Sequence, residues 1–352
     1  MAKWAQIQGL MRTCIVPTAM LTLSGCALFP APDSSPVALP DPQPAVVIAP
    51  PEVPAAPAPV VKVKPLVVTP AVITLPQVAI VLSSRHPAYE KIAIELGEKL
   101  DNFTVFDLSD KSQPPVNAFR KIHDSDTSAV VAVGLRAAIS ATSMSKVPVV
   151  FCQVFNIEQN NLISDNSRGI SSLPPLDLQI AAWKELDPSL SSIGAIVGPG
   201  HEDLIAEAEA AAAEHGIELH FRIAKSDRET LYLFNRLVGE IDGFWLFPDN
   251  RILSAPVLKE MLSYGSRHRV QISVFNESLL ALGATLSSST VDADIADTII
   301  HILGQIASGN IGDVPPVSPL NDVRIVTNEK LLRSMLGTGG NGLTDVTVVA
   351  GQ

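Results

Sequence analysis

The sequence predicts an α/β protein with two doubly wound lobes, each built on a parallel sheet. Short runs that are apolar throughout alternate with stretches in which apolar residues recur at helical spacing. Strands of the first kind are buried on both faces, as in parallel sheets that helices cover. The pattern occurs twice in residues 77–338, a span of roughly 260 residues that suits two lobes of ordinary size. A hinge and an interlobe cleft are therefore expected.

The first repeat of this pattern gives lobe 1. A helix is expected over Pro87–Leu100, where apolar residues recur at helical spacing, and another over Leu135–Met144, after the turn residue Gly134. The predicted buried strands are Val78–Leu82, Phe103–Phe106, Ala129–Val133 and Val147–Phe151.

The second repeat gives lobe 2. An alanine-rich helix is expected over Glu202–His215, with acidic residues at its positive end and Gly216 after its last turn. Ser254 is a candidate cap for a later helix that carries Pro256 in its first turn and ends at Gly265. The predicted strands are Ile193–Val197, Ile217–Ile223, Gly243–Phe247 and Val270–Phe275.

The expected boundaries place residues 77–171 and 276–308 in lobe 1, and residues 172–275 and 309–338 in lobe 2. Residues 339–352 are expected to form a flexible C-terminal tail. The segment Gly337–Gly342 matches the GxGxxG pattern formally. It has no βαβ unit around it to hold a dinucleotide, so we interpret it as part of a flexible tail.

Residues 1–25 have the features of a signal peptide. Lys3 and Arg12 make the leader weakly basic, and the apolar run Thr13–Leu23 is too short to span a bilayer. The sequence Leu23-Ser24-Gly25-Cys26 resembles the lipobox of bacterial lipoproteins. That resemblance implies that Cys26 becomes the mature N-terminus and carries acyl chains, palmitate among them, that anchor the protein to a membrane. The alternative is an unlipidated secretory signal with an accidental cysteine.

Ala27 indicates which membrane holds the expected anchor, and the number of cysteines indicates whether a disulfide can form. Ala27 stands where an aspartate would commonly retain a lipoprotein at the inner membrane, so an outer-membrane anchor facing the periplasm is expected. Of the three cysteines, Cys14 leaves with the signal and Cys26 is blocked by lipid. No intramolecular disulfide is then expected, and Cys152, which follows an apolar run, is interpreted as a buried inert thiol.

Residues 26–76 are expected to form the lipidated N-terminus and a Pro-rich linker. Half of the 28 prolines lie between Pro30 and Pro76, and no glycine occurs between Gly25 and Gly97. Proline fixes φ and removes a hydrogen-bond donor, which favours extended polyproline II. Two interpretations stay open: a stalk that lets the folded part work at a distance from its anchor, or an unselected disordered tether.

Composition and motifs exclude several classes of function. The net charge of −11 and the pI near 5.1 argue against a nucleic-acid partner, which would need a basic face. The seven histidines include no HExxH pairing, and neither a GxSxG elbow nor a phosphate loop occurs. No metal, cofactor or enzymatic activity is therefore predicted, and an enzyme remains only a third option.

Several segments, in this order and spacing, resemble the type I periplasmic binding proteins, and within them the ABC-transporter substrate-binding group, whose better-studied members bind aromatic amino acids. The segments are Arg85–Ala88, Val147–Phe151, Asp242–Asp249, Gly283-Ala284, Val323–Asn328 and Leu336-Gly337. The resemblance covers roughly residues 77–337. It implies two lobes that close by hinge motion on a small solute, with an ABC permease as a partner.

The chain departs from that family after its fourth predicted strand. Asn156-Ile157-Glu158 stands where family members tend to carry Asp-Pro, and Asp165–Gly169 replaces a Pro-Gly-Gly-Asn turn. The resemblance places this loop at the cleft. The change therefore bears on the ligand more than on the fold.

Ligands of open parallel sheets bind outside the carboxyl ends of the strands. Hydroxyl and N–H groups at Ser83–Arg85 and Gly134–Arg136 are expected to suit a carboxylate, and Asp249 or Glu277 an ammonium group. The ordinary alternatives are helix caps for Ser84, turn formation for Asp249 and solvated arginines; Trp245 and Phe247 are expected in the core. The candidate ligand-binding residues are Ser84, Arg85, Arg136, Gln153, Asn156, Asp249, Asn276 and Glu277.

The function expected from the sequence is that of a non-enzymatic, lipid-anchored solute-binding protein of the bacterial envelope. Its ligand is expected to be a small amino-acid-like molecule or organic acid. The alternative is an outer-membrane lipoprotein that uses the binding-protein fold to contact or regulate an envelope or cell-wall machine, since a fold does not fix a function. Either an ABC permease or an envelope protein complex is then the partner.

Overall fold

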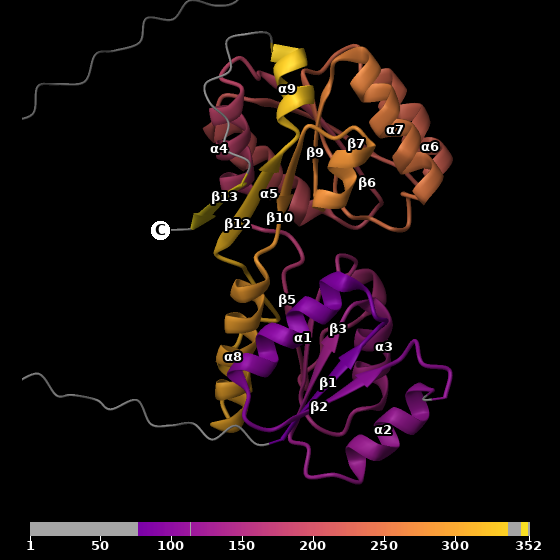
Figure 1. Ribbon diagram of the computed structural model, residues 1–352, viewed down its shortest axis with the longest axis vertical. Helices are drawn as coiled ribbons and strands as arrows, with labels where there is room; N and C mark the ends of the chain where they lie inside the picture. Colours follow the sequence, from indigo (N-terminus) through magenta and orange to yellow (C-terminus); the bar gives the residue numbers. More distant parts are fainter. Residues whose placement is uncertain (1–76, 113, 337–345, 351–352) are drawn as a thin grey trace, which may run out of the picture. The chain divides into compact units, whose positions relative to one another are not determined.

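The computed structural model describes residues 77–112, 114–336 and 346–350. The predicted signal peptide, Cys26, the Pro-rich linker and Gly337–Gly342 lie outside these residues. The described part contains two α/β lobes with separate sheets, as the apolar pattern predicts (Figure 1). No helix in it is both long and apolar enough to cross a membrane.

Lobe 1 is a six-stranded sheet in the order β11-β5-β4-β3-β1-β2. All of its neighbouring strands pair in parallel. The strands are β1 (Val78–Leu82), β2 (Phe103–Asp107), β3 (Ala129–Val133), β4 (Val149–Cys152), β5 (Ser167–Ile170) and β11 (Val317–Ser318).

The two faces of this sheet bury alternate side chains of the same strands. Val78, Ile80 and Leu82 pack in a core with helices α1 (Pro87–Lys99) and α8 (Asp292–Ala307), which lie side by side in Figure 1. The opposite core contains Ala79 and Val81 with α2 (Pro115–His123) and α3 (Leu135–Met144). Burial on both faces explains why these strands are apolar throughout.

Lobe 2 is a seven-stranded sheet in the order β13-β12-β10-β9-β8-β6-β7. Its strands pair in parallel except that β12 is antiparallel to both β10 and β13. The strands are β6 (Ser192–Val197), β7 (Glu218–Ile223), β8 (Gly243–Trp245), β9 (Gln271–Val274), β10 (Leu286–Ser289), β12 (Asp322–Thr327) and β13 (Val346–Ala350).

Helices cover this second sheet on both faces. One core contains residues of α6 (Asp227–Leu237) and α7 (Ala255–His268), and the other contains residues of α4 (Leu176–Leu186) and α5 (Glu202–Glu214). Helix α9 (Glu329–Leu336) follows β12. Three short 3₁₀ helices complete the secondary structure, η1 (Glu158–Asn160), η2 (Glu277–Leu282) and η3 (Ile311–Asp313).

The chain passes between the lobes later than the expected boundaries place it. Strand β10 pairs with β9 and β12, so residues 286–289 belong to the sheet of lobe 2 rather than to lobe 1. Strand β11 pairs with β5, so residues 317–318 belong to lobe 1 rather than to lobe 2. The crossings therefore follow β5, β10 and β11, and residues 346–350, expected in a flexible tail, form the edge strand β13.

The structure also corrects two elements. The strand at Phe103 was expected to be buried, but β2 is an edge strand in which Phe103 is 37% and Val105 is 46% exposed. Helix α7 does not end at Gly265 but continues to His268, and Arg269 ends it in the left-handed conformation with φ of 60°. Gly265 is required for close packing instead, because a Cβ there would lie 2.5 Å from Cδ1 of Ile272.

Candidate functional site

A cavity of about 280 Å³ lies between the lobes, at the carboxyl ends of strands from both sheets. Lobe 1 contributes the starts of α1 and α3 and the loop after β4. Lobe 2 contributes Pro248 and Asn250 after β8, and Phe275 and Asn276 after β9. Ser172, in the crossing after β5, and Thr290, in the crossing between β10 and α8, complete the wall. Binding at strand ends in a parallel sheet is the general rule for this class of fold.

The start of helix α3 forms the part of the wall best suited to an acidic group. Its first residue, Leu135, lines the cavity, and Gly134 precedes it with φ of 86°. Ser83 Oγ accepts a hydrogen bond from Ala137 N at 2.9 Å. The N–H groups of Leu135 and Arg136 come before the first intrahelical bond and have no partner among the described residues. Unpaired N–H groups and the helix dipole favour a negative charge at such a position.

Aromatic side chains supply the apolar part of the wall. Tyr89, Phe155 and Phe275 line the cavity together with Val154 and Leu135. Tyr89 reaches from the first turn of α1 toward α3, since a Cβ on Gly134 would lie only 2.9 Å from its hydroxyl oxygen. Phe155 stacks against Phe247 of lobe 2, with ring centroids 6.4 Å apart. A ligand with a flat or branched apolar body fits these walls.

Gln153 lines the cavity in an unusual backbone conformation. Its φ is 58°, in the left-handed region that few residues other than glycine adopt. Asn161 and Arg269, with the same sign of φ, stand at helix ends, where such a conformation is ordinary. Gln153 follows β4 instead, and its Nε2 donates to Thr290 Oγ1 at 3.3 Å. Backbone strain of this kind is frequent at ligand sites.

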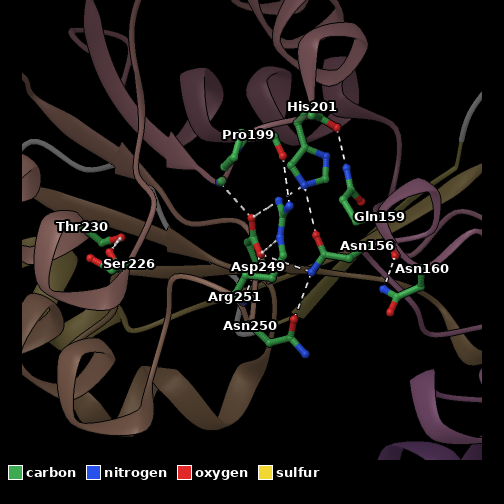
Figure 2. A network of polar contacts seen from close by, with 12 residues as sticks. Asn156, Gln159, Asn160, Pro199, His201, Ser226, Thr230, Asp249, Asn250 and Arg251 are labelled. Carbon is green, nitrogen blue, oxygen red and sulfur yellow. Dashed lines mark hydrogen bonds and ion pairs between the residues drawn. The ribbon is translucent and has the colours of Figure 1, made fainter.

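A buried polar network joins the two lobes beside the cavity (Figure 2). Asn156 Nδ2 donates to Asp249 Oδ1 at 3.1 Å and to Asn250 Oδ1 at 2.9 Å. Asn156 Oδ1 lies 3.1 Å from Nε2 of His201, and Gln159 Nε2 donates to the carbonyl of Gly200. Asn156 is almost fully buried, and both ends of its amide are used by lobe 2.

Asp249 is the centre of this network and is fully buried. Its Oδ2 accepts from Gly198 N at 2.8 Å and from Arg251 Nη2 at 2.8 Å. Its Oδ1 accepts from Arg251 Nε at 2.9 Å and from the Arg251 backbone N–H at 3.1 Å, besides Asn156. Burial alone would raise the pKa of this carboxyl, but the His201 ring, the Arg251 guanidinium and the Gly198 N–H hold it well below its usual range.

The structure brings together only part of the set of candidates from the sequence. Gln153, Asn156 and Asn276 line the cavity. Asp249 lies behind its wall, bound to Arg251. Glu277 pairs with Arg324, and both line an adjoining pocket with Lys91 and Asp292.

The remaining candidates do not line the cavity. Arg85 pairs with Asp107 at 3.1 Å, and its side chain is 74% exposed. Arg136 is exposed on the first turn of α3, and Ser84 precedes α1 without capping it, since His86 is the N-cap.

Several residues of the wall were not among the candidates. Tyr89, Phe155, Asn250, Phe275 and Thr290 all line the cavity. Tyr89, Phe155, Asn250 and Phe275 lie at or within a few residues of a predicted strand end or helix start, which is the signal that could have found them, whereas Thr290 follows β10, a strand that the sequence analysis did not predict. His201 was also missed; it lies just after the Gly198-Pro199-Gly200 turn at the end of β6.

Two expectations about the core are confirmed. Trp245 and Phe247 are buried, and the Cys152 thiol is fully buried. Burial raises the pKa of Cys152 to about 12, so the thiol is protonated at neutral pH and is a poor nucleophile. Within residues 77–112 and 114–336, no group of three His, Cys, Asp or Glu side chains is placed to hold a metal ion.

Two α/β lobes with a cavity at facing strand ends define the chain as a protein of the type I periplasmic binding class. The sequence profile of the ABC transporter substrate binding protein family matches residues 93–337. The chain therefore belongs to that family, as the sequence motifs indicated. A search of curated protein sequences gave no match.

Solved structures support the fold. One similar chain is an ABC domain in complex with L-Trp from Streptococcus pneumonia, with 20% identity, a TM-score of 0.51, and coverage of 74% of this chain and 94% of the other. Another is the ligand-free, open form of a substrate-binding protein with adhesive properties from Clostridium difficile, with 16% identity, a TM-score of 0.55, and coverage of 79% and 100%. A conserved domain protein from Vibrio cholerae has 20% identity, a TM-score of 0.53, and coverage of 74% and 94%.

Proposed function

We propose that this protein is a non-enzymatic solute-binding protein that holds a small ligand in the cavity between its lobes. The observation that carries this proposal is the cavity itself. It lies at strand ends of both sheets, combines aromatic walls with amide and hydroxyl groups, and includes the strained Gln153. Family membership agrees with the proposal.

The chemistry of the wall favours a ligand with an acidic group. The unpaired N–H groups at the start of α3 would receive its carboxylate, and the rings of Tyr89, Phe155 and Phe275 would enclose its body. An amino-acid-like molecule and an organic acid both satisfy this description. The similar chain from Streptococcus pneumonia was solved with L-Trp, which makes amino acids a reasonable first set to test.

A binding screen tests the proposal. The purified full chain is heated with amino acids and with small organic acids, and ligands that raise its melting temperature are then measured by calorimetry. A ligand at 100 times its dissociation constant should stabilise the fold by about 2.7 kcal/mol. A complete lack of stabilisation by both sets, together with an empty cleft in crystals soaked with them, would contradict the proposal.

We further propose that Cys26 carries lipid and anchors the chain at the outer membrane, facing the periplasm. Its support is the Leu23-Ser24-Gly25-Cys26 sequence and the alanine at position 27. Cells grown with labelled palmitate should label the wild-type chain and not the Cys26→Ser variant. Fractionation should recover the wild-type chain with the outer membrane, and recovery with the inner membrane would contradict the sorting expectation.

A second function, as an interaction module or regulator of an envelope or cell-wall machine, is favoured by one observation. The loop after β4, in which the sequence departs from its family at Asn156-Ile157-Glu158, binds lobe 2 directly through the side chains of Asn156 and Gln159. Such bonds hold two lobes together with no ligand between them. Crosslinking in cells separates the two functions, because an ABC permease among the products supports transport and a wall or export component supports the interaction role.

A further inference from the structure

One of the two carboxylates that the sequence suggests for a ligand ammonium group is already bound by an arginine of this chain. The sequence suggests Asp249 or Glu277 as a partner for a ligand ammonium group, yet the Arg251 guanidinium binds both oxygens of Asp249, at 2.9 Å and 2.8 Å. The backbone N–H groups of Gly198 and Arg251 and the Asn156 amide take further acceptor positions of that carboxylate. Asp249 is therefore saturated, as well as fully buried.

None of the described residues that line the cavity carries a carboxylate. Among the described residues that line it, the polar side chains are amides, hydroxyls and His86. His86 Nδ1 accepts a hydrogen bond from Ala88 N at 3.3 Å. An ammonium group moved from water into this wall would lose its hydration without gaining an ionic partner, which is costly.

Glu277 and Asp292 line an adjoining pocket that shares part of its wall with this cavity, including Gln153, Asn276 and Thr290. Glu277 is paired with Arg324. Asp292 is a half-buried carboxyl whose pKa is raised by burial, and its side chain makes no hydrogen bond or ion pair among the described residues. These two residues are the strongest rivals of the inference, and the test below includes them.

We propose that the solute of this cleft is a carboxylic acid with an aromatic or branched apolar body and no α-ammonium group, because Arg251 takes the place of that ammonium at Asp249. The inference rests on the proposed solute-binding function and narrows it from amino-acid-like molecules and organic acids to the second class. Asn250 is the residue of the wall at which this preference for an uncharged solute body is tested. Its Oδ1 accepts a hydrogen bond from Asn156, while its Nδ2 points away from the network (Figure 2).

The test compares ligands that differ only in the amine. Calorimetry on the full chain in detergent uses the pairs phenylalanine and 3-phenylpropionate, tryptophan and indole-3-propionate, and leucine and 4-methylpentanoate, with phenethylamine as an amine without a carboxylate. At least one acid should bind ten times or more tighter than its amino acid, and phenethylamine should not bind.

A substitution at Asn250 is the second arm. Asn250→Asp keeps the oxygen that accepts from Asn156 and adds a negative charge to the wall without changing its size. This variant should bind the acid at least ten times more weakly than the wild-type chain does, and it should bind the matching amino acid more tightly by a similar factor. Asn235→Asp adds the same charge at an exposed site on α6 of the same lobe and should change neither affinity.

The outcomes separate the inference from the function on which it rests. Tighter binding of an amino acid than of its acid by the wild-type chain overturns the inference and leaves the solute-binding function intact. Loss of such binding in Glu277→Gln or Asp292→Asn would identify the true ammonium partner. If no acid, amino acid or amine binds, the proposed function fails and the inference with it.

Discussion

At the scale of single residues, Asn156 is the most informative side chain. It is buried, and its amide bonds three residues of the other lobe, Asp249, Asn250 and His201. Removing it leaves polar groups of lobe 2 without partners, which typically costs about 1–3 kcal/mol. We expect Asn156→Ala to lower the free energy of unfolding by that amount in urea denaturation.

A matched variant shows whether the loss is specific to the network. Asn235→Ala removes the same amide from an exposed position of α6. It should change the free energy of unfolding by less than about 0.5 kcal/mol, as exposed substitutions usually do. Equal values for the two variants would show that the interlobe bonds contribute nothing measurable.

Arg251 is the second residue with a defined prediction. Without its guanidinium, the Asp249 carboxylate would stay buried without a cationic partner, and breaking such a pair costs about 3–5 kcal/mol. The Arg251 side chain is 30% exposed, so we expect a cost near the lower end of that range. Arg251→Ala should lower the free energy of unfolding by about 3 kcal/mol in denaturation experiments at pH 7.

The same variant should alter the pH dependence of stability. The pKa of Asp249 in the folded protein lies below its unfolded value, which is about 3.9. The carboxylate therefore stabilises the fold above that pH, and the contribution is lost as the pH falls toward the lower folded pKa. Denaturation curves should show the deficit of Arg251→Ala largest near neutrality and shrinking below about pH 4. A deficit that is constant with pH would contradict this account.

At the scale of elements, strands whose burial is uniform were predictable from sequence. Strands β1 and β3 and helix α3 have the bounds that their apolar patterns predict. The edge position of β2 was not predictable, because an apolar run does not show how many neighbouring strands a strand has. Its exposed Phe103 lies over Gly97 of α1, since a Cβ at Gly97 would approach its ring to 3.1 Å.

The candidate site was predictable to the same degree. The rule that ligands bind at strand ends selected Gln153, Asn156 and Asn276, and the structure places these three in the cavity wall. It could not show that Arg251 folds back onto Asp249, because that contact depends on the turn after β8. Nor could it select Tyr89, whose side chain reaches the wall only because of the rotational position of α1.

The turn before α3 gives a prediction at this scale. Gly134 has φ of 86°, and a Cβ there would lie 2.7 Å from Ser83 Oγ and 2.8 Å from the Tyr89 ring. Gly216, after α5, has φ of 67° with no atom within 4 Å of its Cβ position. Gly216→Ala should therefore cost only the backbone strain, about 1–2 kcal/mol. Gly134→Ala should cost at least about 1 kcal/mol more and should also weaken ligand binding.

Thermal denaturation of the two glycine variants measures the difference, and calorimetry with a ligand from the screen measures binding. Gly134 has φ of 86° and ψ of 167°, a conformation almost exclusive to glycine, so its larger loss contains extra backbone strain as well as the contact with Ser83 and Tyr89. Equal losses of stability in both variants would mean that these side chains move aside without cost.

At the scale of the two lobes together, the hydrogen bonds between the lobes lie beside the cavity and share a residue with its wall. Asn156 both lines the cavity and binds Asp249 behind it. Segments held by few contacts open locally at a lower free energy than the cores do. Removing the two amides that join the lobes should therefore loosen the segments that meet there while leaving both sheets intact.

Hydrogen exchange on the full chain, with Asn156 and Gln159 both replaced by alanine, checks this expectation. Exchange should rise in residues 153–161, 198–203 and 249–251, which contribute the interlobe bonds, and stay unchanged in β1 and β3, which are fully buried. A ligand that spans the cavity should restore protection in all three segments together, because it contacts both lobes. Protection confined to one lobe would mean that the ligand binds that lobe alone, and closure would then play no part in recognition.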